Sequence, residues 1–378
     1  MAKIEIKQVT TKKDLKKFIK FSDDLYKDEP NYVYYLHFDE MNFFLPEKNP
    51  AYEYCRTIEF LAYEDGKIVG RISGLINDVY NKKVNKRFLR FNHFDFIDDV
   101  EVARALLNAI IEWGQKEGMT ELNGPLGATD LDKQGMLVEG FEYKGMYITY
   151  YNFAYYPKIM DQLGFKKDVD WVEYLVPMPK SVDPRLEKIS GMLLDRYGFK
   201  LLNFKSFKEF EPYAKQLFHI MDEAFAPLHG TVPITEKQVQ SYVDLALKVI
   251  NFEYVKLIAD KDGKIVAFGA LASSLTEATR PSKGKLFPLG WYRVLHTMKH
   301  SKVLDMYFVG VLPEYQSLGV NAILMSAITK AAMKNGVEMA ETGPELEDNE
   351  KIQAQWKNYE GVKKIRRRRC YIRKLEKL

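Results

Sequence analysis

An apolar run followed by a polar turn and a helical pattern is the clearest signal along this chain. The run from Met306 to Leu312 is rich in β-branched and aromatic residues and is stopped by Pro313, which predicts a strand. Gly336 predicts the end of the helix that follows. That helix shows apolar residues at the helical spacing, namely Val320, Ile323, Leu324, Ala327, Ile328 and Ala331.

The turn between this strand and this helix favours an anionic ligand. The segment Gln316–Asn321 opens the helix, so its backbone N–H groups and the positive end of the helix dipole converge on one point. The strand ends in Gly310–Val311, whose main-chain groups can pair with an extended ligand. Together they suggest a ligand with an amide-bearing arm and a pyrophosphate, although an ordinary strand-to-helix turn has the same pattern.

Alternating and helical patterns earlier in the chain predict a series of further elements. Asp98 and Asp99 are expected to cap a helix that ends near Gly118. A Glu-Asp-Gly turn is expected to join two strands of a hairpin. The predicted elements are a strand at Ile4–Val9, a helix at Lys12–Lys27, a hairpin over 61–76, a strand at Phe88–Phe96 and a helix from Val100 to about Glu117.

The same order recurs in the second half, which indicates a duplication. A helix at Phe210–Phe225 and a hairpin over 254–272 precede the strand and helix described first. The pentapeptide Asp-Gly-Lys-Ile-Val stands at 65–69 and 262–266, an offset of 262 − 65 = 197. Asn152 and Asn349 have the same offset, and each precedes a glycine by twelve residues. The predicted units are 1–178 and 179–378, with loop elaborations at 124–148 and 281–302.

The motif in the second unit resembles that of a known superfamily. The pattern V-x-P-x-Y-Q-x-x-G-x resembles the acyl-CoA-binding motif of the GNAT superfamily of N-acyltransferases, in which the strand pairs with pantetheine and loop amides hold the pyrophosphate. The sequence departs from that motif at Asn321, where the family has Gly or Ala, and a side chain there would narrow the phosphate site. By resemblance the cofactor site comprises Val309, Gly310, Val311, Gln316, Ser317, Leu318, Gly319, Val320, Asn321 and Asn349.

This resemblance implies an α/β fold of two tandem GNAT-like units, each a mixed, mostly antiparallel twisted sheet flanked by helices. The first unit is degenerate, because Asp95, Asp98 and Asp99 stand where the phosphate turn would be and would repel a pyrophosphate. Further segments resemble a group of bacterial double-GNAT proteins, some of which acylate amines of lipids or of cell-wall precursors. These segments are Asn123–Gly127, Gly135–Phe141, Tyr151–Tyr156, Leu163–Phe165, Glu345–Asn349 and Arg368–Lys374.

Acyl transfer from a thioester to an amine needs a base, oxyanion donors and, optionally, an acid. The backbone amides of Val309 to Val311 are the expected oxyanion donors. Glu341, at the end of a strand expected to splay from the motif strand, is the first candidate base and His229 the second. By resemblance, the general acid is a tyrosine seven residues after Asn349, but Trp356 occupies that position. Tyr359, nearby in the sequence, is therefore the candidate acid. Further candidate bases are Asp222 and Glu223, and each carboxylate has the plainer interpretation of a solvated helix or strand end.

Composition limits the number of domains, the kinds of partner and the compartment that we expect for this protein. A chain of 378 residues with a formal charge of +4 is large enough for two cores, and that charge does not imply a nucleic-acid partner. Two cysteines and scattered histidines predict no metal site and a reducing cytosol. The N-terminus lacks the apolar core of a signal peptide, and no apolar run reaches the ~18 residues of a membrane span. The basic tail at 363–369 is expected to be an edge strand rather than a nucleic-acid patch.

The insertion at 283–302 predicts a basic amphipathic helix from Gly290. Trp291, Val294, Leu295 and Met298 share one face, opposite Arg293 and Lys299. Such a helix can lie on an anionic membrane or roof an acyl pocket, or it can simply pack on its own domain. The sequence thus predicts a cytoplasmic or membrane-peripheral N-acyltransferase that uses acetyl-CoA or a longer acyl-CoA and a small or lipid-like amine. The alternative is a non-catalytic acyl-CoA or lipid-binding protein.

Overall fold

The computed structural model describes residues 3–356 and 359–378, with the backbone only for 245–249. Its first half carries seven strands and five α-helices, with one short 3-10 helix, and the predicted elements occur among them in the expected order. The elements are β1 (Glu5–Gln8), α1 (Lys12–Leu25), α2 (His37–Phe43), η1 (Pro50–Glu53), β2 (Cys55–Glu64), β3 (Lys67–Asn77), α3 (Asp78–Val84), β4 (Phe88–Phe96), α4 (Val100–Lys116), β5 (Glu121–Gly124), β6 (Met136–Glu139), α5 (Tyr155–Gln162) and β7 (Lys166–Pro177).

The second half repeats this order with a different set of insertions. Its elements are α6 (Pro184–Tyr197), β8 (Lys200–Asn203), α7 (Phe207–Phe225), α8 (Glu236–Val249), η2 (Phe252–Tyr254), β9 (Val255–Ala259), β10 (Ile265–Ser273), α9 (Thr276–Thr279), η3 (Arg280–Ser282), α10 (Gly290–His300), β11 (Val303–Val311), η4 (Pro313–Leu318), α11 (Val320–Lys334), β12 (Met339–Thr342), β13 (Glu345–Leu346), α12 (Glu350–Trp356) and β14 (Lys363–Lys374).

The predicted boundaries hold where local chemistry sets them. Asp99 caps α4 by accepting a hydrogen bond from the Glu101 amide at 2.7 Å, so the capping interpretation of this carboxylate is confirmed. Gly336 follows α11 with a φ of 67°. The last strand of each half begins at 166 and 363, which is again an offset of 363 − 166 = 197. The predicted fold class of two tandem α/β units is confirmed.

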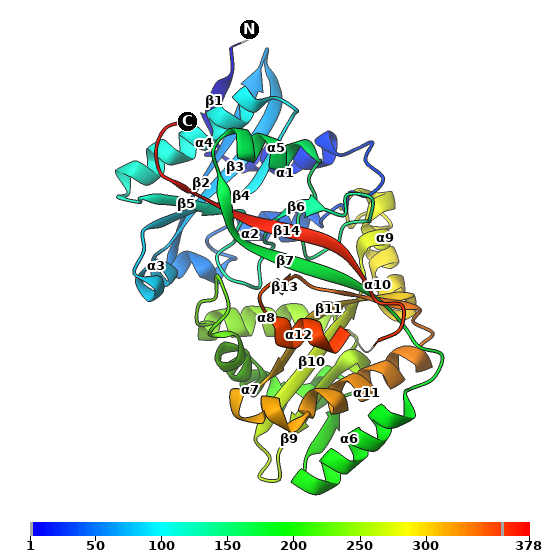
Figure 1. Cartoon of the computed structure of the whole chain (residues 1–378). Helices are drawn as coiled ribbons and strands as arrows, with labels where there is room; N and C mark the ends of the chain where they lie inside the picture. The colour runs from blue at the N-terminus through cyan, green and yellow to red at the C-terminus, as the bar shows by residue number, and fades with distance from the viewer. Residues whose placement is uncertain (1–2, 357–358) are drawn as a thin grey trace.

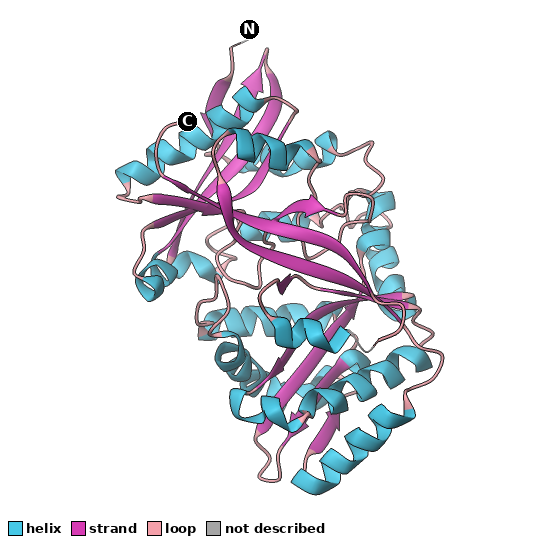
Figure 2. Cartoon of the chain, viewed as in Figure 1, coloured by secondary structure: helices cyan, strands magenta, loops and turns pink. Residues whose placement is uncertain are grey.

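The two halves exchange their last strands, which the sequence did not suggest. The strand order is β1-β2-β3-β4-β5-β14-β7-β12-β11-β10-β9-β8, so β14 pairs with β5 of the first half and β7 pairs with β12 of the second. Both β14 and β7 run through the junction between the halves (Figure 1). The result is one continuous sheet across the molecule (Figure 2) rather than two separate sheets. The strand pairing therefore crosses the predicted boundary at 178, and that boundary remains a prediction.

The basic tail is an interior strand, so the expectation of an edge strand is wrong. Arg366 and Arg368 point to one face, where they are fully buried and both pair with the buried carboxylate of Glu173. Arg367 and Arg369 pair with Asp170 on the other face. The charges are tolerated at the centre of the sheet because each guanidinium has an acidic partner on β7, a strand from the other half.

Helices cover both faces of the second half-sheet. A Cβ at Gly269 of β10 would lie 2.8 Å from Ile328 of α11, which packs on one face. A Cβ at Gly310 of β11 would lie 2.5 Å from Phe268 and 3.4 Å from Phe225 of α7, which packs on the other. Glycine is therefore required at Gly310 for close packing. Within the described residues, no helix is both long and apolar enough to cross a membrane.

Candidate functional site

The turn between β11 and α11 has the predicted place in the chain, and its binding of a phosphate remains a prediction. Residues Pro313–Leu318 form the 3-10 helix η4, and Gly319 follows in the left-handed region with φ 74° and ψ 16°. α11 then begins at Val320 with no side chain capping its first turn. A helical turn followed by a left-handed residue points successive N–H groups into one concavity, which the helix dipole makes positive.

Asn321, which departs from the family motif, is turned toward a neighbouring helix. Its Nδ2 donates to Gln355 Oε1 of α12 at 2.7 Å. Its Oδ1 is buried and has no hydrogen-bond partner among the described residues. The side chain is therefore anchored beside the turn, and it leaves one unsatisfied acceptor there.

The motif strand has one free edge beyond its pairing with β12. β11 pairs with β12 only from Val303 to Met306, and the Gly343 amide donates to the Met306 carbonyl at 3.1 Å where the strands part. The bulge at Tyr307 marks this point, because Ala270 and Leu271 of β10 face Phe308 and Met306. From there to Val311 the edge opposite β10 meets no other strand in the described chain. Its backbone groups are thus placed to pair with an extended ligand.

We call the point where β11 and β12 separate, just after Met306, the splay. A buried carboxylate lies next to it, where the two strands are still paired. Asp305 is fully buried, and neither carboxylate oxygen has a hydrogen-bond partner among the described residues. Burial and the neighbouring Glu341 carboxylate raise the pKa of Asp305 to about 7, although the Ser274 hydroxyl and Arg366 act in the opposite direction. A carboxylate with a pKa near neutrality is suited to proton transfer.

Glu341, the first predicted base, is the register neighbour of Asp305 on β12. Its carboxylate forms an ion pair with Arg366 and is mostly buried. Arg366 also pairs with Glu173 and donates to the Lys144 carbonyl, so it is held from three sides. Glu341 therefore lies beside Asp305 with its carboxylate paired to a guanidinium, and its role as a base remains a prediction.

His229, the second predicted base, lies in another part of the molecule. Its Nε2 is 3.0 Å from Asp168 Oδ2, and its ring packs against Trp171. Burial raises the pKa of Asp168, but hydrogen bonds from His229 and Asn123 outweigh this effect and lower it overall. Asp168 is seven residues along β7 from Leu175, the partner of Glu341, which is roughly 23 Å of strand. The structure thus separates His229 from Asp305 and Glu341.

The predicted acid lies beside Trp356, in a cluster that also contains Met306 of β11. Trp356 is buried and donates from Nε1 to Glu345 at 3.0 Å, and burial raises the pKa of Glu345 to about 8. The Tyr359 ring packs 5.8 Å from the Trp356 ring, and burial raises the pKa of this phenol. Asn349 accepts from the Ile352 amide at 3.4 Å and so caps α12. The roles given to Tyr359 and Asn349 remain predictions.

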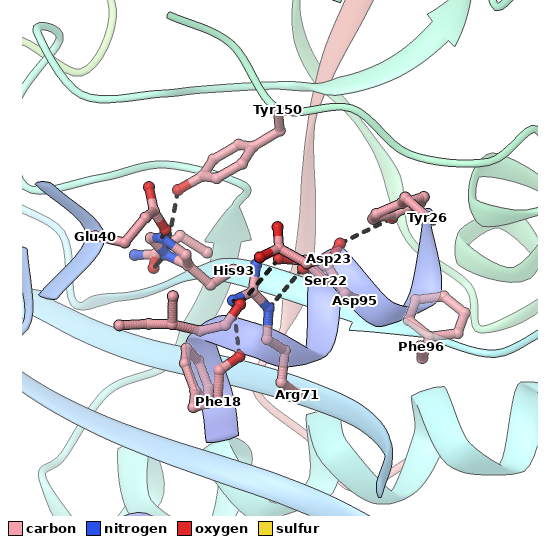
Figure 3. A network of polar contacts seen from close by, with 12 residues as sticks. Phe18, Ser22, Asp23, Tyr26, Glu40, Arg71, His93, Asp95, Phe96 and Tyr150 are labelled. Carbon is pink, nitrogen blue, oxygen red and sulfur yellow. Dashed lines mark hydrogen bonds and ion pairs between the residues drawn. The ribbon is translucent and has the colours of Figure 1, made fainter. Parts of the chain in front are cut away.

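The corresponding region of the first half is filled by its own side chains. Asp95 of β4 accepts hydrogen bonds from Arg71 at 2.7 Å and Tyr26 at 2.8 Å, and these side chains reach it from β3 and from the residue that follows α1 (Figure 3). Tyr156 bonds both Tyr26 and the Phe96 amide. The remaining cavity, between His93 and Tyr156, is about 20 Å³, which is enough for one water. Asp95 is thus part of a closed network and not of a phosphate turn.

Sequence reasoning missed Asp305 because the predicted strand began one residue later, at Met306. The signal was nevertheless present, since Asp305 interrupts the apolar run Val303–Val311 on its N-terminal side. A lone carboxylate inside a buried strand needs either a counter-ion or a function.

Comparison with known proteins relates the chain to both sequence and structural neighbours. No family model matches it. It is 28% identical over 329 residues to Protein YghO of Escherichia coli (strain K12), covering 86% of this chain and 83% of that protein. It is 25% identical over 363 residues to the bacterial ceramide synthase of Caulobacter vibrioides (strain NA1000 / CB15N), covering 92% of each.

Solved structures also match over nearly the whole chain, and two of them show its fold. One is a tandem GNAT protein from the clavulanic acid biosynthesis pathway, with a TM-score of 0.60 at 12% identity and 99% coverage of both chains. The other is a GCN5-related N-acetyltransferase from Sphaerobacter thermophilus, with a TM-score of 0.54 at 12% identity and coverage of 99% and 96%. The chain therefore has the tandem GNAT fold that the sequence predicted, and one of its relatives in sequence is named as a ceramide synthase.

Proposed function

We propose that the second half binds an acyl-CoA and transfers its acyl group to the amine of a lipid-like acceptor, with Asp305 as the general base. The observation that carries this proposal is the position of Asp305. It is a buried carboxylate without a hydrogen bond at the point where β11 leaves β12, and its pKa is raised to about 7. A lipid-like acceptor is favoured because the relative from Caulobacter is named for making ceramide, an amide of a long-chain amino alcohol.

The residues present fit an acyl-CoA. The free edge of β11 from Tyr307 to Val311 suits the amide-bearing pantetheine arm. The uncapped start of α11 and the left-handed Gly319 suit a pyrophosphate. The unsatisfied Oδ1 of Asn321 is an acceptor for a hydroxyl or amide of the ligand. With the pyrophosphate at the start of α11 and the pantetheine arm along β11, the thioester would lie near the bulge at Tyr307.

In the proposed reaction Asp305 takes a proton from the acceptor ammonium, which frees the amine lone pair. Bound acyl-CoA supplies the thioester: the amine nitrogen forms the C–N bond, the C–S bond breaks, and the leaving sulfur takes up a proton. The backbone amides of Val309 to Val311 would donate to the oxyanion. Arg366 pairs with Glu341 and Glu173. Burial, and after it the neighbouring Glu341 carboxylate, keep the pKa of Asp305 high enough for a base.

The test is turnover of palmitoyl-CoA or acetyl-CoA with a long-chain amino alcohol, and with ethanolamine as the short control. We expect the long amine to give an amide, detected by mass spectrometry, together with stoichiometric free CoA thiol. Asp305→Asn should lower kcat by about 100-fold or more, with palmitoyl-CoA affinity within about twofold of wild type. Wild-type kcat in Asp305→Asn would remove Asp305 from the mechanism.

The alternative function is a non-catalytic acyl-CoA or lipid-binding protein. It is supported by Trp356, which occupies the position of the expected general-acid tyrosine and donates a hydrogen bond to Glu345. Saturable binding of palmitoyl-CoA without amide formation, across amines of both lengths, would favour this alternative over the enzyme.

A further inference from the structure

An exposed apolar surface lies on α10, the loop before it and the neighbouring α2. The side chains are large and well exposed, with Phe287 at 79%, Phe38 at 59% and Tyr292 at 57%. The insertion reaches α2 because the His37 amide donates to the Gly284 carbonyl at 3.1 Å. We call this surface the apolar patch, and its residues are Phe38, Phe287, Leu289, Trp291, Tyr292 and Leu295.

The patch is built on a packed base. Val294, on the inner face of α10, is buried in a cluster with Leu36 and Leu275, and Met298 packs against the same cluster. The plainer prediction, that the helix packs on its own protein, is thus correct for Val294 and Met298. Trp291 donates from Nε1 to the Pro288 carbonyl at 3.0 Å, so its polar atom is satisfied while its ring stays exposed. The apolar side chains therefore face outward from an ordered element.

The insertion is also strongly basic. Residues 283–302 hold four lysines, one arginine and no acidic residue, a formal charge of +5, so the other 358 residues sum to 4 − 5 = −1. Lys302 pairs with Glu338 at 2.8 Å. Among the described residues, no ion pair is formed by the remaining cations of the insertion, which are Lys283, Lys285, Arg293 and Lys299. The exposed face of α10 thus carries Trp291, Tyr292 and Leu295 beside Lys299.

We propose that the apolar patch docks on the surface of an anionic lipid bilayer. Aromatic and aliphatic side chains would enter the boundary between headgroups and acyl chains, and the unpaired cations beside them would meet lipid phosphates. A second copy of the chain is a poorer occupant, because a two-fold contact would set the same unpaired cations against each other. The inference concerns lipid binding and does not depend on acyl transfer.

The patch lies close to the candidate site. The cluster beneath it also contacts Tyr147, which donates to Asp39 at 3.0 Å. Burial, and after it the charges of Asp305 and Asp39, raise the pKa of Tyr307 in the bulge of β11. On the neighbouring strand, Ser273 donates to the Met298 carbonyl at 2.9 Å. A bilayer bound to the patch would therefore stand beside the splay, at the edge of the junction between the halves where α9 and α10 lie (Figure 1).

The test is flotation of the full chain with vesicles of phosphatidylcholine, with and without phosphatidylglycerol. The apolar variant is Trp291→Ser/Tyr292→Ser/Leu295→Ser, and the charge variant is Lys283→Glu/Lys285→Glu/Lys299→Glu. The control is Ile189→Ser/Met192→Ser on α6, whose side chains are 43% and 52% exposed and lie outside the patch. All are surface changes, and circular dichroism checks that each variant is folded.

We expect wild type and the control to float with the anionic vesicles, and both patch variants to lose at least about tenfold in affinity. Added salt should lower the affinity of the wild type for anionic vesicles, because it screens the same charges that the charge variant reverses. Wild type that does not bind anionic vesicles would overturn the proposal. A dimer of the wild type in light scattering that dissociates in the apolar variant, without vesicle binding, would overturn it in favour of a second copy.

Discussion

Asp305 and Glu341 face each other as the third of the four residue pairs that join β11 to β12. Only Glu341 has an ion pair, with Arg366, whereas both oxygens of Asp305 lack a hydrogen-bond partner among the described residues. Two carboxylates held side by side in a buried place cannot both be ionised without cost, and the unpaired one carries the higher proton affinity. This asymmetry distinguishes a candidate base from a structural acid.

The pH dependence of turnover should report this asymmetry. The pKa of Asp305 is raised to about 7, and a base acts in its ionised form, so kcat/KM should rise with pH through about 7 and then level off. Glu341→Gln removes a negative charge that raises this pKa, so the rising limb should move to lower pH. The measurement is a pH-rate profile of both proteins, and an unchanged limb would show that Asp305 does not titrate in the mechanism.

The same group should make the stability of the folded state fall as the pH rises from mildly acidic to neutral values. The folded pKa of Asp305, about 7, lies above the ordinary pKa of an aspartate carboxyl, about 3.9, so the folded state binds the proton more tightly than the unfolded state. Wild type should therefore lose stability relative to Asp305→Asn as pH rises from about 4 to about 7, by at most about 4 kcal/mol, and the difference should then stay constant. Urea unfolding at several pH values measures this, and a difference that shrinks over that range would contradict it.

Cofactor binding should depend on the turn at Gly319. Gly319→Glu places a carboxylate at the proposed pyrophosphate site, so calorimetric affinity for CoA should fall by at least about 30-fold. Gly336→Glu is the matched control, because Gly336 has a similar φ of 67° against 74° and stands at the other end of the same helix. Equal loss of affinity in both variants would attribute the effect to backbone strain and not to the phosphate site.

One CoA should bind per chain. The splay of the first half is closed by Arg71, Asp95, Tyr26 and Tyr156, whereas the free edge of β11 is open. Calorimetry should therefore give a stoichiometry near one, and Gly319→Glu should remove all of the heat. Residual saturable binding at half the original stoichiometry would show that the first half also holds a nucleotide.

The buried arginines should be essential for the join between the halves. Glu173→Gln leaves Arg366 and Arg368 without their shared counter-charge, and breaking a buried pair in this way costs about 3–5 kcal/mol. Lys363→Met, at the exposed start of the same strand, is the control and should change stability by less than about 0.5 kcal/mol. The measurement is urea unfolding, and a Glu173→Gln variant as stable as wild type would contradict the expectation.

Much of the fold could be predicted because local chemistry sets it. The caps at Asp99 and Gly336, the hairpin turns and the alternation within each strand act over a few residues and can be read directly. The phosphate turn at Gly319 belongs to this class, since its function depends on backbone conformation within one short segment. The basic amphipathic helix at α10 was predictable for the same reason, as its periodicity is local.

The partners of buried charges depended on the tertiary structure. Nothing near Arg366 in the sequence shows that β14 lies inside the sheet, because its acidic partner Glu173 stands 193 residues earlier on an exchanged strand. The distinction between Asp305 and Glu341 has the same origin, since Arg366 reaches one of them and leaves the other unpaired. Sequence determines where an ionisable group can stand, but its proton affinity depends on burial and on charges that only folding brings within a few ångströms.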